Sequence, residues 1–279
     1  MTKRIEEGAI RFNTDSNKME VWIGDKWMIV STSESSPIAP RADIMTGYGP
    51  ADTNTMDDFN IPTLGDAVDC GDDTISRRQA GGCSSRTRGI NAAGTPDVDT
   101  ISFIEIATAG NAQDFGNLLS NLRQPSSANS PTRGIIAGGD NPSNTNIIQF
   151  VTIASTGNAV DFGDLTSNRR GSGIGPSSNA VRAIFAGGYT PSASNSMDFI
   201  SLTSTGNARD FGDLTGQPTM PATTASPTRL VIAGGTRSPD YSNIIDYVTI
   251  ATIGNASNFG DLTDGREQAV GVSNAHGGL

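Results

Sequence analysis

Two sets of carboxylates recur along the chain at a fixed offset, and carboxylates are the first side chains to consider for acid–base or calcium chemistry. The two sets are Asp114, Asp161 and Asp210, and Asp72, Asp164, Asp213 and Asp261. Catalytic carboxylates have to be asymmetric, because a substrate breaks the symmetry of a repeated structure. A calcium loop needs several converging oxygens, and no Asp-x-Asp-x-Asp-Gly run is present. We therefore expect the repeated acids to hydrogen-bond turns and backbone.

Arginines recur with the same regularity, at Arg41, Arg88, Arg133, Arg182 and Arg229. Their periodicity again favours a structural role. We expect them to pair with the repeated acids between neighbouring repeats.

The remaining reactive side chains form no recognisable catalytic set. The single histidine, His276, makes no metal cluster by itself, and Gly171–Gly175 lacks the lysine and the helix of a phosphate loop. Cys70 occupies a position that holds phenylalanine in other repeats. The sequence is compatible both with free thiols and with a disulfide between Cys70 and Cys83. We expect no enzyme activity, no metal and no cofactor.

Composition narrows the class of protein. The chain has 279 residues, a net charge of −10 and only 17% charged residues, with 33 glycines and 14 prolines. Such an acidic chain is unsuited to binding nucleic acid, no apolar run is long enough to span a membrane, and no secretory signal is apparent at the N-terminus. We expect a protein made in a cytosol and rich in short strands and turns.

A repeat organises most of the sequence. Gly-Asn-Ala-x-Asp-Phe-Gly or a close variant begins at glycines 65, 110, 157, 206 and 254, with spacings of 45, 47, 49 and 48 residues. The five anchor arginines have spacings of 47, 45, 49 and 47. The glycine phrase and the arginine each occur five times at nearly the same interval, so the sequence predicts five structural units.

Each unit is predicted to contain four strands. In the clearest copy these are Arg133–Ala137, Phe150–Ala154, Val160–Leu165 and a small-residue strand near Gly171–Ser178. Units of this length with four strands are typical of propeller blades, whereas a solenoid needs caps that neither end supplies. The sequence predicts an all-β, five-bladed propeller over residues 41–279.

The C-terminus supplies the strand that the first blade lacks. The segment 268–276 matches the blade-joining segment 79–87. We expect it to close the ring, with the closing residues Gln268, Val270, Val272 and His276.

The units resemble kelch repeats in the Gly138-Gly139 step, Phe150, and Phe162 in place of the usual tryptophan. Units reading Thr-Arg-x-Ile-x-Ala-Gly-Gly followed by Gly-Asn-Ala-x-Asp-Phe-Gly are also similar to those of structural proteins of tailed phages, notably cyanophages. This resemblance implies a kelch-like propeller in a virion.

Residues 1–35 form a separate predicted module, joined by a linker at 36–40. Strands near Ile10–Asn13, Met19–Ile23 and Trp27–Val30 alternate apolar and polar side chains. The module resembles the attachment segments of phage tail-fibre and baseplate proteins. Its expected attachment residues are Ile10, Phe12, Val21, Trp22, Ile23, Trp27 and Met28.

The two resemblances imply a non-enzymatic virion protein, assembled in the host cytoplasm and anchored by the module to other virion proteins. By analogy with fibres we expect a homo-oligomer, a trimer. The propeller would decorate the particle or recognise a host glycan or protein. Recognition is expected on variable loops, through Tyr48, Arg77, Arg123, Arg169, Tyr189, Arg237 and Tyr241.

Three alternatives remain open. The first is a capsid-decorating or head-fibre protein, which the module makes less favoured than a tail protein. The second is a glycan-active propeller enzyme using acids found in single repeats, such as Asp43 and Glu267. The third is an intracellular kelch-type interaction module.

Overall fold

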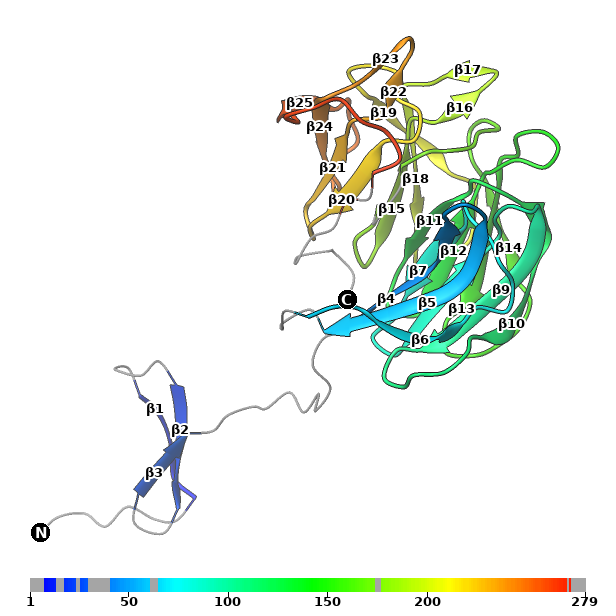
Figure 1. Cartoon of the computed structure of the whole chain (residues 1–279). Helices are drawn as coiled ribbons and strands as arrows, with labels where there is room; N and C mark the ends of the chain where they lie inside the picture. Colours follow the sequence, from blue (N-terminus) through cyan, green and yellow to red (C-terminus); the bar gives the residue numbers. More distant parts are fainter. Residues whose placement is uncertain are drawn as a thin grey trace, which may run out of the picture. The chain divides into compact units, whose positions relative to one another are not determined.

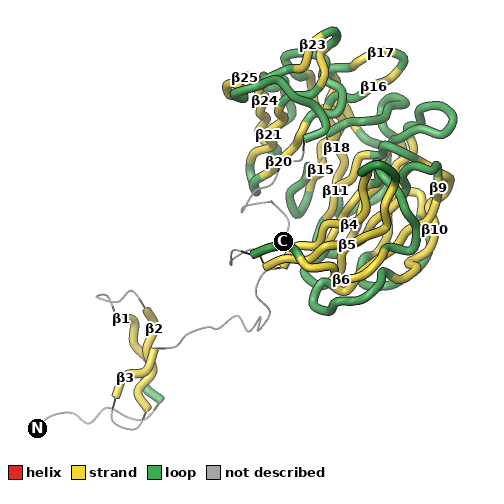
Figure 2. The backbone as a smooth tube through the Cα atoms, in the orientation of Figure 1, coloured by secondary structure: helices red, strands yellow, loops and turns green. Residues whose placement is uncertain are grey.

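The structure, a computed structural model, describes residues 8–13, 18–23, 26–29, 41–60, 65–173, 177–269 and 271. The chain divides into two compact units, Met1–Pro40 and Arg41–Leu279, here called the N-terminal unit and the propeller-like unit. All the regular secondary structure among the described residues is β-strand, so the predicted all-β class is confirmed (Figures 1 and 2). Within this described part, no helix is long and apolar enough to cross a membrane.

The N-terminal unit contains a three-stranded antiparallel sheet. Its strands are β1 (Ile10–Asn13), β2 (Lys18–Ile23) and β3 (Lys26–Ile29), with β2 in the middle. Trp22 lies opposite Trp27, and Val21 lies opposite Met28. Because successive side chains point to opposite faces of a strand, the two tryptophans lie on one face and Val21 and Met28 on the other.

The propeller-like unit contains five sheets of three or four strands among its described residues. We number them in chain order. Sheet 1 comprises β4 (Arg41–Tyr48), β5 (Asp52–Asn60) and β6 (Val68–Asp72). Sheet 2 comprises β7 (Gly81–Ser84), β8 (Arg88–Ala92), β9 (Val98–Glu105) and β10 (Gln113–Leu122). Sheet 3 comprises β11 (Ser126–Asn129), β12 (Arg133–Ala137), β13 (Ile147–Thr152) and β14 (Val160–Asp164).

The last two sheets carry additional short hairpins. Sheet 4 comprises β15 (Arg182–Ala186), β18 (Ser196–Ser201) and β19 (Arg209–Asp213). Sheet 5 comprises β20 (Ala222–Ala225), β21 (Arg229–Ala233), β24 (Ile244–Thr249) and β25 (Ser257–Asp261). The hairpins are β16 (Tyr189–Thr190) with β17 (Ser192–Ala193), and β22 (Thr236–Arg237) with β23 (Asp240–Tyr241).

Apolar clusters join each sheet to the next. One cluster contains Phe115 of sheet 2 and Val151 of sheet 3, and comparable clusters join sheets 1 and 2, 3 and 4, and 4 and 5. Short antiparallel sheets stacked face to face in chain order make a β-propeller-like fold.

The anchor arginines reinforce these joints in a way that differs from the prediction. Arg133 lies with its Cζ 5.0 Å from the centre of the Phe150 ring, and its Nη1 donates to the carbonyl of Leu202 in the next sheet. Arg88 and Arg182 make the equivalent contacts with their own sheets' phenylalanines and the next sheets' carbonyls. The expectation that these arginines pair with the repeated acids is therefore wrong for these three, because an aromatic ring and a backbone oxygen take that place.

The Gly-Asn-Ala phrase is the backbone joint between sheets, and a tight turn is only part of its role. The amide of Gly157 donates to the carbonyl of Phe115 at 2.7 Å, and that of Ala159 donates to Asn117 at 2.8 Å. The Asn158 side chain accepts from the Asn117 amide at 3.0 Å. The same three bonds occur at the other three joints between consecutive sheets. Each bond needs a fixed backbone path, which explains why the phrase recurs.

Two acids of the repeat serve their own strands, namely the predicted Asp210 and Asp69, which occupies the same position in the first repeat. Asp69 accepts from the Gly71 amide at 2.9 Å, and Asp210 accepts from the Gly212 amide at 3.3 Å. For Asp210 the predicted backbone role is confirmed.

Candidate recognition face

The loops after the Gly-Gly step lie against the linkers that join one sheet to the next. Four isolated bridges connect them, namely Arg78 with Thr95, Arg123 with Asp140, Arg170 with Tyr189, and Thr219 with Thr236. In each of the later bridged linkers, the residue that follows the bridged one donates its amide to the preceding linker. Gln124 N donates to Gln79 O at 3.0 Å, and Gly171 N donates to Gln124 O at 3.1 Å. The linkers therefore lie side by side at one end of the sheets.

Two of the predicted recognition residues are buried, and the prediction is wrong for them. Arg77 and Arg169 have no solvent exposure. Arg169 Nη2 lies 3.1 Å from Asp198 Oδ2, and Nη1 donates to the carbonyls of Gly187 and Ser196. Burial lowers the pKa of both guanidinium groups by desolvating the charged form, and the partner carboxylate opposes that shift. Each arginine fastens a linker to the following sheet, so a ligand cannot reach it.

The next residue in each linker points the other way. Arg78 and Arg170 keep 38% and 33% of their side chains exposed. Adjacent residues of an extended segment alternate in direction, so an Arg-Arg doublet places one side chain inside and one outside. The doublets at 77–78 and 169–170 are the signal that could have identified these outward arginines.

Arg237 also belongs to the interior more than to the surface. Its Nη2 lies 3.2 Å from Asp246 Oδ2, and its side chain is 19% exposed. Pro218 occupies the linker position that Arg169 fills in the preceding linker, so in sheet 5 the counter-charge for the buried Asp246 comes from Arg237 in β22 instead. The recognition role predicted for Arg237 is therefore not supported by its position.

Exposed side chains on three adjacent linkers and their loops form an arc at this end, with Tyr48, Arg78, Arg123, Arg170 and Tyr189 as its exposed members. Arg78 Cζ lies 4.6 Å from the centre of the Tyr48 ring, and Arg170 Cζ lies 5.2 Å from that of Tyr189. Arg123 Nε lies 2.9 Å from Asp140 Oδ1. Tyr241 is also exposed but lies outside this arc, on the β22–β23 hairpin.

Asp140 is the buried centre of this arc. Its side chain is 2% exposed and pairs with both Arg123 and Arg170. Burial raises the pKa of Asp140, but the hydrogen bonds from Arg123 and Arg170 outweigh that effect and hold the pKa below its ordinary value. The carboxylate is therefore ionised at neutral pH and fixes two guanidinium groups in place.

The acids considered for glycoside hydrolysis have different partners. Asp43 is half-buried in sheet 1 and lies 4.0 Å from the Cys70 sulfur, whereas Glu267 accepts from the Thr236 hydroxyl at the linker end. The described residues contain no group of three or more His, Cys, Asp or Glu side chains that could hold a metal ion.

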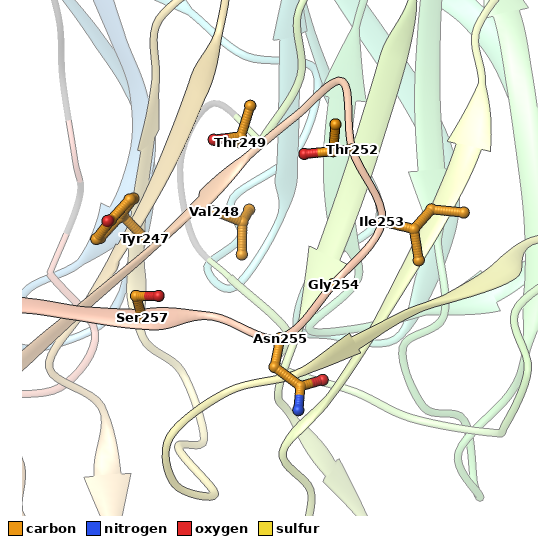
Figure 3. A pocket seen from close by; sticks show the side chains of 8 residues that line it. All are labelled: Tyr247, Val248, Thr249, Thr252, Ile253, Gly254, Asn255 and Ser257. Carbon is orange, nitrogen blue, oxygen red and sulfur yellow. The ribbon is translucent and has the colours of Figure 1, made fainter.

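A shallow pocket of about 180 Å³ lies beside the turn between β24 and β25 (Figure 3). It is lined by Tyr247, Val248, Thr249, Thr252, Ile253, Gly254, Asn255 and Ser257. Tyr247 is the only titratable side chain in the lining, and Asn255 already accepts from the Asp213 amide. The pocket therefore offers no acid–base pair.

The two cysteines are free thiols in separate apolar clusters. Cys83 packs against Gly134, where a Cβ atom would lie 2.4 Å from its sulfur. Burial raises the pKa of Cys83 to about 12. Burial, followed by the charges of Asp43 and Asp58, raises the pKa of Cys70.

We expect neither thiol of the folded protein to react with iodoacetamide at pH 8 within an hour, because the thiolate is the nucleophile and both pKa values are raised. Mass spectrometry after quenching should show full labelling only in urea. The neutral Cys83 thiol stabilises the fold below about pH 9, and that contribution should disappear as the pH approaches 12. Rapid labelling of Cys83 without denaturant would contradict the packing between sheets 2 and 3.

The expected attachment residues do not form one surface. Ile10, Phe12, Ile23 and Met28 are exposed and share a face with Val21. On the other face Trp22 and Trp27 meet edge to face at 5.3 Å, and Arg11 lies over Trp27 and pairs with Glu20. The apolar face is thus the exposed one, while the tryptophans are half-buried beside an ion pair.

Of the predicted ring-closing residues, only Gln268 is described. Its amide donates to the Met220 carbonyl at 3.2 Å, as the equivalent residues of earlier linkers do. Val270, Val272 and His276 lie outside the described residues.

Comparison with known proteins gives a fold and no family. No family model and no curated protein matches the chain. The solved structure of YjhT is similar, with a TM-score of 0.69 and 10% identity, covering 84% of each chain. Because 306 chains of solved structures match, the architecture is common, and this likeness supports the propeller-like fold alone.

Proposed function

We propose that this protein is a non-enzymatic structural component of a tailed-phage virion, anchored through its N-terminal unit and presenting the propeller for recognition or decoration. The observation that carries the proposal is the separate three-stranded sheet with an exposed apolar face. So small a sheet buries little apolar surface by itself, and an exposed apolar face marks an interaction site, so the sheet suits attachment to another protein. Its sequence resemblance to tail-fibre and baseplate modules supports the same role.

The proposed scaffold is a closed ring of five kelch-like blades, one for each sheet. Gln79, Gln124, Gly171, Met220 and Gln268 occupy equivalent positions and all have positive φ, between 51° and 59°. Four amide-to-carbonyl bonds link them in that order. A fifth bond, from Gln79 to Gln268, would complete the circle.

Sheets 1 and 5 carry matching halves of one further joint. Phe259 is 55% exposed, whereas its equivalents Phe115, Phe162 and Phe211 are buried. Ile44 is 57% exposed, whereas Ile136 and Phe185 at the same position are buried. Arg266 occupies the linker position of Arg169, and Asp57 occupies the strand position of Asp198. Closure of the ring would therefore bring Arg266 and Asp57 together as an ion pair. These pairings support a ring in which the last sheet packs on the first.

Deleting residues 1–35 is expected to abolish incorporation into particles while leaving the propeller folded, because the larger unit has its own apolar clusters. Incorporation can be measured by quantitative mass spectrometry of purified particles assembled with the full or truncated chain. Thermal unfolding of the truncated protein checks its fold. Normal incorporation of the truncated chain would rule out anchoring by this unit.

Point variants can then identify the anchoring face. Phe12→Asp introduces a charge on the apolar face at a position that is 54% exposed, and should reduce incorporation. Val160→Asp is the matched control, because Val160 is 56% exposed in the propeller-like unit. Equal incorporation of both variants would exclude the apolar face as the anchor.

A further inference from the structure

The asymmetry of the linker end distinguishes it from the repeated scaffold. The five equivalent linker positions hold Arg78, Arg123, Arg170, Thr219 and Glu267. Three arginines therefore lie on three adjacent linkers, and the remaining two positions carry no positive charge. A binding site should break the repeat in this way, because one ligand occupies one side of a ring.

The arc pairs each charge with an opposite one. Arg78 pairs with Asp52, Arg123 with Asp97 and Asp140, and Arg170 with Asp140. Three guanidinium groups thus face three carboxylates, so the arc has no net charge. Strong anions gain little from such a surface, whereas a group that both donates and accepts hydrogen bonds can engage an arginine and an aspartate together.

The guanidinium groups also retain unused donors. Among the described residues, Arg78 bonds through Nη1 to Asp52 and Arg170 bonds through Nη1 to Asp140, which leaves Nε and Nη2 of each without a partner. Each of these arginines stacks on a tyrosine ring, and Tyr48 and Tyr189 are 64% and 39% exposed. The arc therefore presents exposed aromatic surface beside oriented polar groups.

We propose that the arc formed by Tyr48, Arg78, Arg123, Asp140, Arg170 and Tyr189 binds a neutral carbohydrate chain. The CH groups of pyranose rings pack on the two tyrosines, and vicinal hydroxyls donate to Asp52 and Asp97 while accepting from the arginines. The two tyrosines stand at opposite ends of the arc, so the ligand is an oligosaccharide and spans more than one sugar ring. This inference rests on the proposed recognition role and assigns its ligand class.

The test is a glycan array probed with the full-length protein, carrying neutral, carboxylated and sulfated oligosaccharides. We expect binding to neutral chains that changes little between 50 and 500 mM NaCl. Tyr48→Ala and Tyr189→Ala should each weaken binding by about tenfold or more. Tyr241→Ala is the matched control and should bind normally, since Tyr241 is as exposed as Tyr48 and more exposed than Tyr189 but lies outside the arc on the β22–β23 hairpin.

Three results would overturn the inference. They are binding to none of the arrayed sugars, binding confined to charged sugars and lost in salt, and binding that Tyr241→Ala weakens as much as Tyr189→Ala. Unchanged melting temperatures of the three variants would show that exposed side chains alone were altered. Particle incorporation of the Tyr48→Ala/Tyr189→Ala protein separates the two proposals, because anchoring by the N-terminal unit predicts normal incorporation whatever the array shows.

Discussion

Gly163→Ala is expected to lower the free energy of unfolding by about 4 kcal/mol. Gly163 has φ +143°, which costs an alanine about 1–3 kcal/mol. A Cβ atom there would lie 2.5 Å from the carbonyl carbon of Gly206 and 2.6 Å from its oxygen, and such overpacking costs a further 1–3 kcal/mol, roughly. The opposing atoms are backbone atoms of the joint between sheets 3 and 4, so they cannot rotate away. Urea unfolding measures the loss.

Two other glycines separate strain from packing. Gly157 has φ +156° and no atom within 4 Å of a Cβ, so Gly157→Ala should cost the strain alone. Gly260 has φ +147° and equally open space, yet the closed ring would place it against Gly65. Closure therefore predicts that Gly260→Ala costs as much as Gly163→Ala. A cost equal to that of Gly157→Ala would mean that sheet 5 does not pack on sheet 1.

Asp198→Ala is expected to destabilise the protein by about 3–5 kcal/mol, because it leaves the Arg169 guanidinium buried without its counter-charge. It also removes the acceptor for the Thr166 amide and hydroxyl, which lie 2.9 and 2.7 Å from the Asp198 carboxylate. Differential scanning calorimetry should show a melting temperature lower by roughly 6–20 °C for a domain of this size.

Sheet 3 provides the design of the rescue variant. For sheet 3, Leu122 occupies the position of Arg169 and Gln149 that of Asp198. Gln149 accepts a hydrogen bond from the Leu119 amide at 2.8 Å, as Asp198 does from the Thr166 amide. Arg169→Leu/Asp198→Gln should therefore recover most of the stability that Asp198→Ala loses. A double variant as unstable as the single one would show that the buried charge is not the source of the loss.

The strand content could be predicted because the signal repeats. Arg133–Ala137 was predicted from its apolar run and coincides with β12. The following strand was predicted at Phe150–Ala154 but runs over Ile147–Thr152. The strand begins earlier because Ile147 and Ile148 pair with Asp164 and Gly163 of β14, across a register shift in which Phe162 is the extra residue. The residues at which a strand begins and ends depend on its pairing with the neighbouring strand, and the composition of the segment does not show that pairing.

The recognition face was harder to predict because arginine serves opposite purposes here. Arg169 and Arg170 are adjacent and chemically identical, yet one is buried against Asp198 and the other is exposed beside Tyr189. Only the direction of the linker distinguishes them. Tyr48, Tyr189 and Tyr241 lie in loops that vary between repeats, and Arg123 lies in the second set of loops expected on the same face; all four are at least partly exposed. The alternation of side chains in the doublets would have corrected Arg77 and Arg169, whereas Arg237 lies in no doublet and its pairing with Asp246 has no such signal.

Cryo-electron microscopy of the intact particle tests the central proposal most directly. We predict a map in which the apolar face of the N-terminal sheet, with Phe12 and Met28, is covered by another virion protein, while a ring of five blades projects with its linker end accessible. A particle lacking the protein, or one in which the N-terminal sheet touches no other virion protein, would contradict the proposed function.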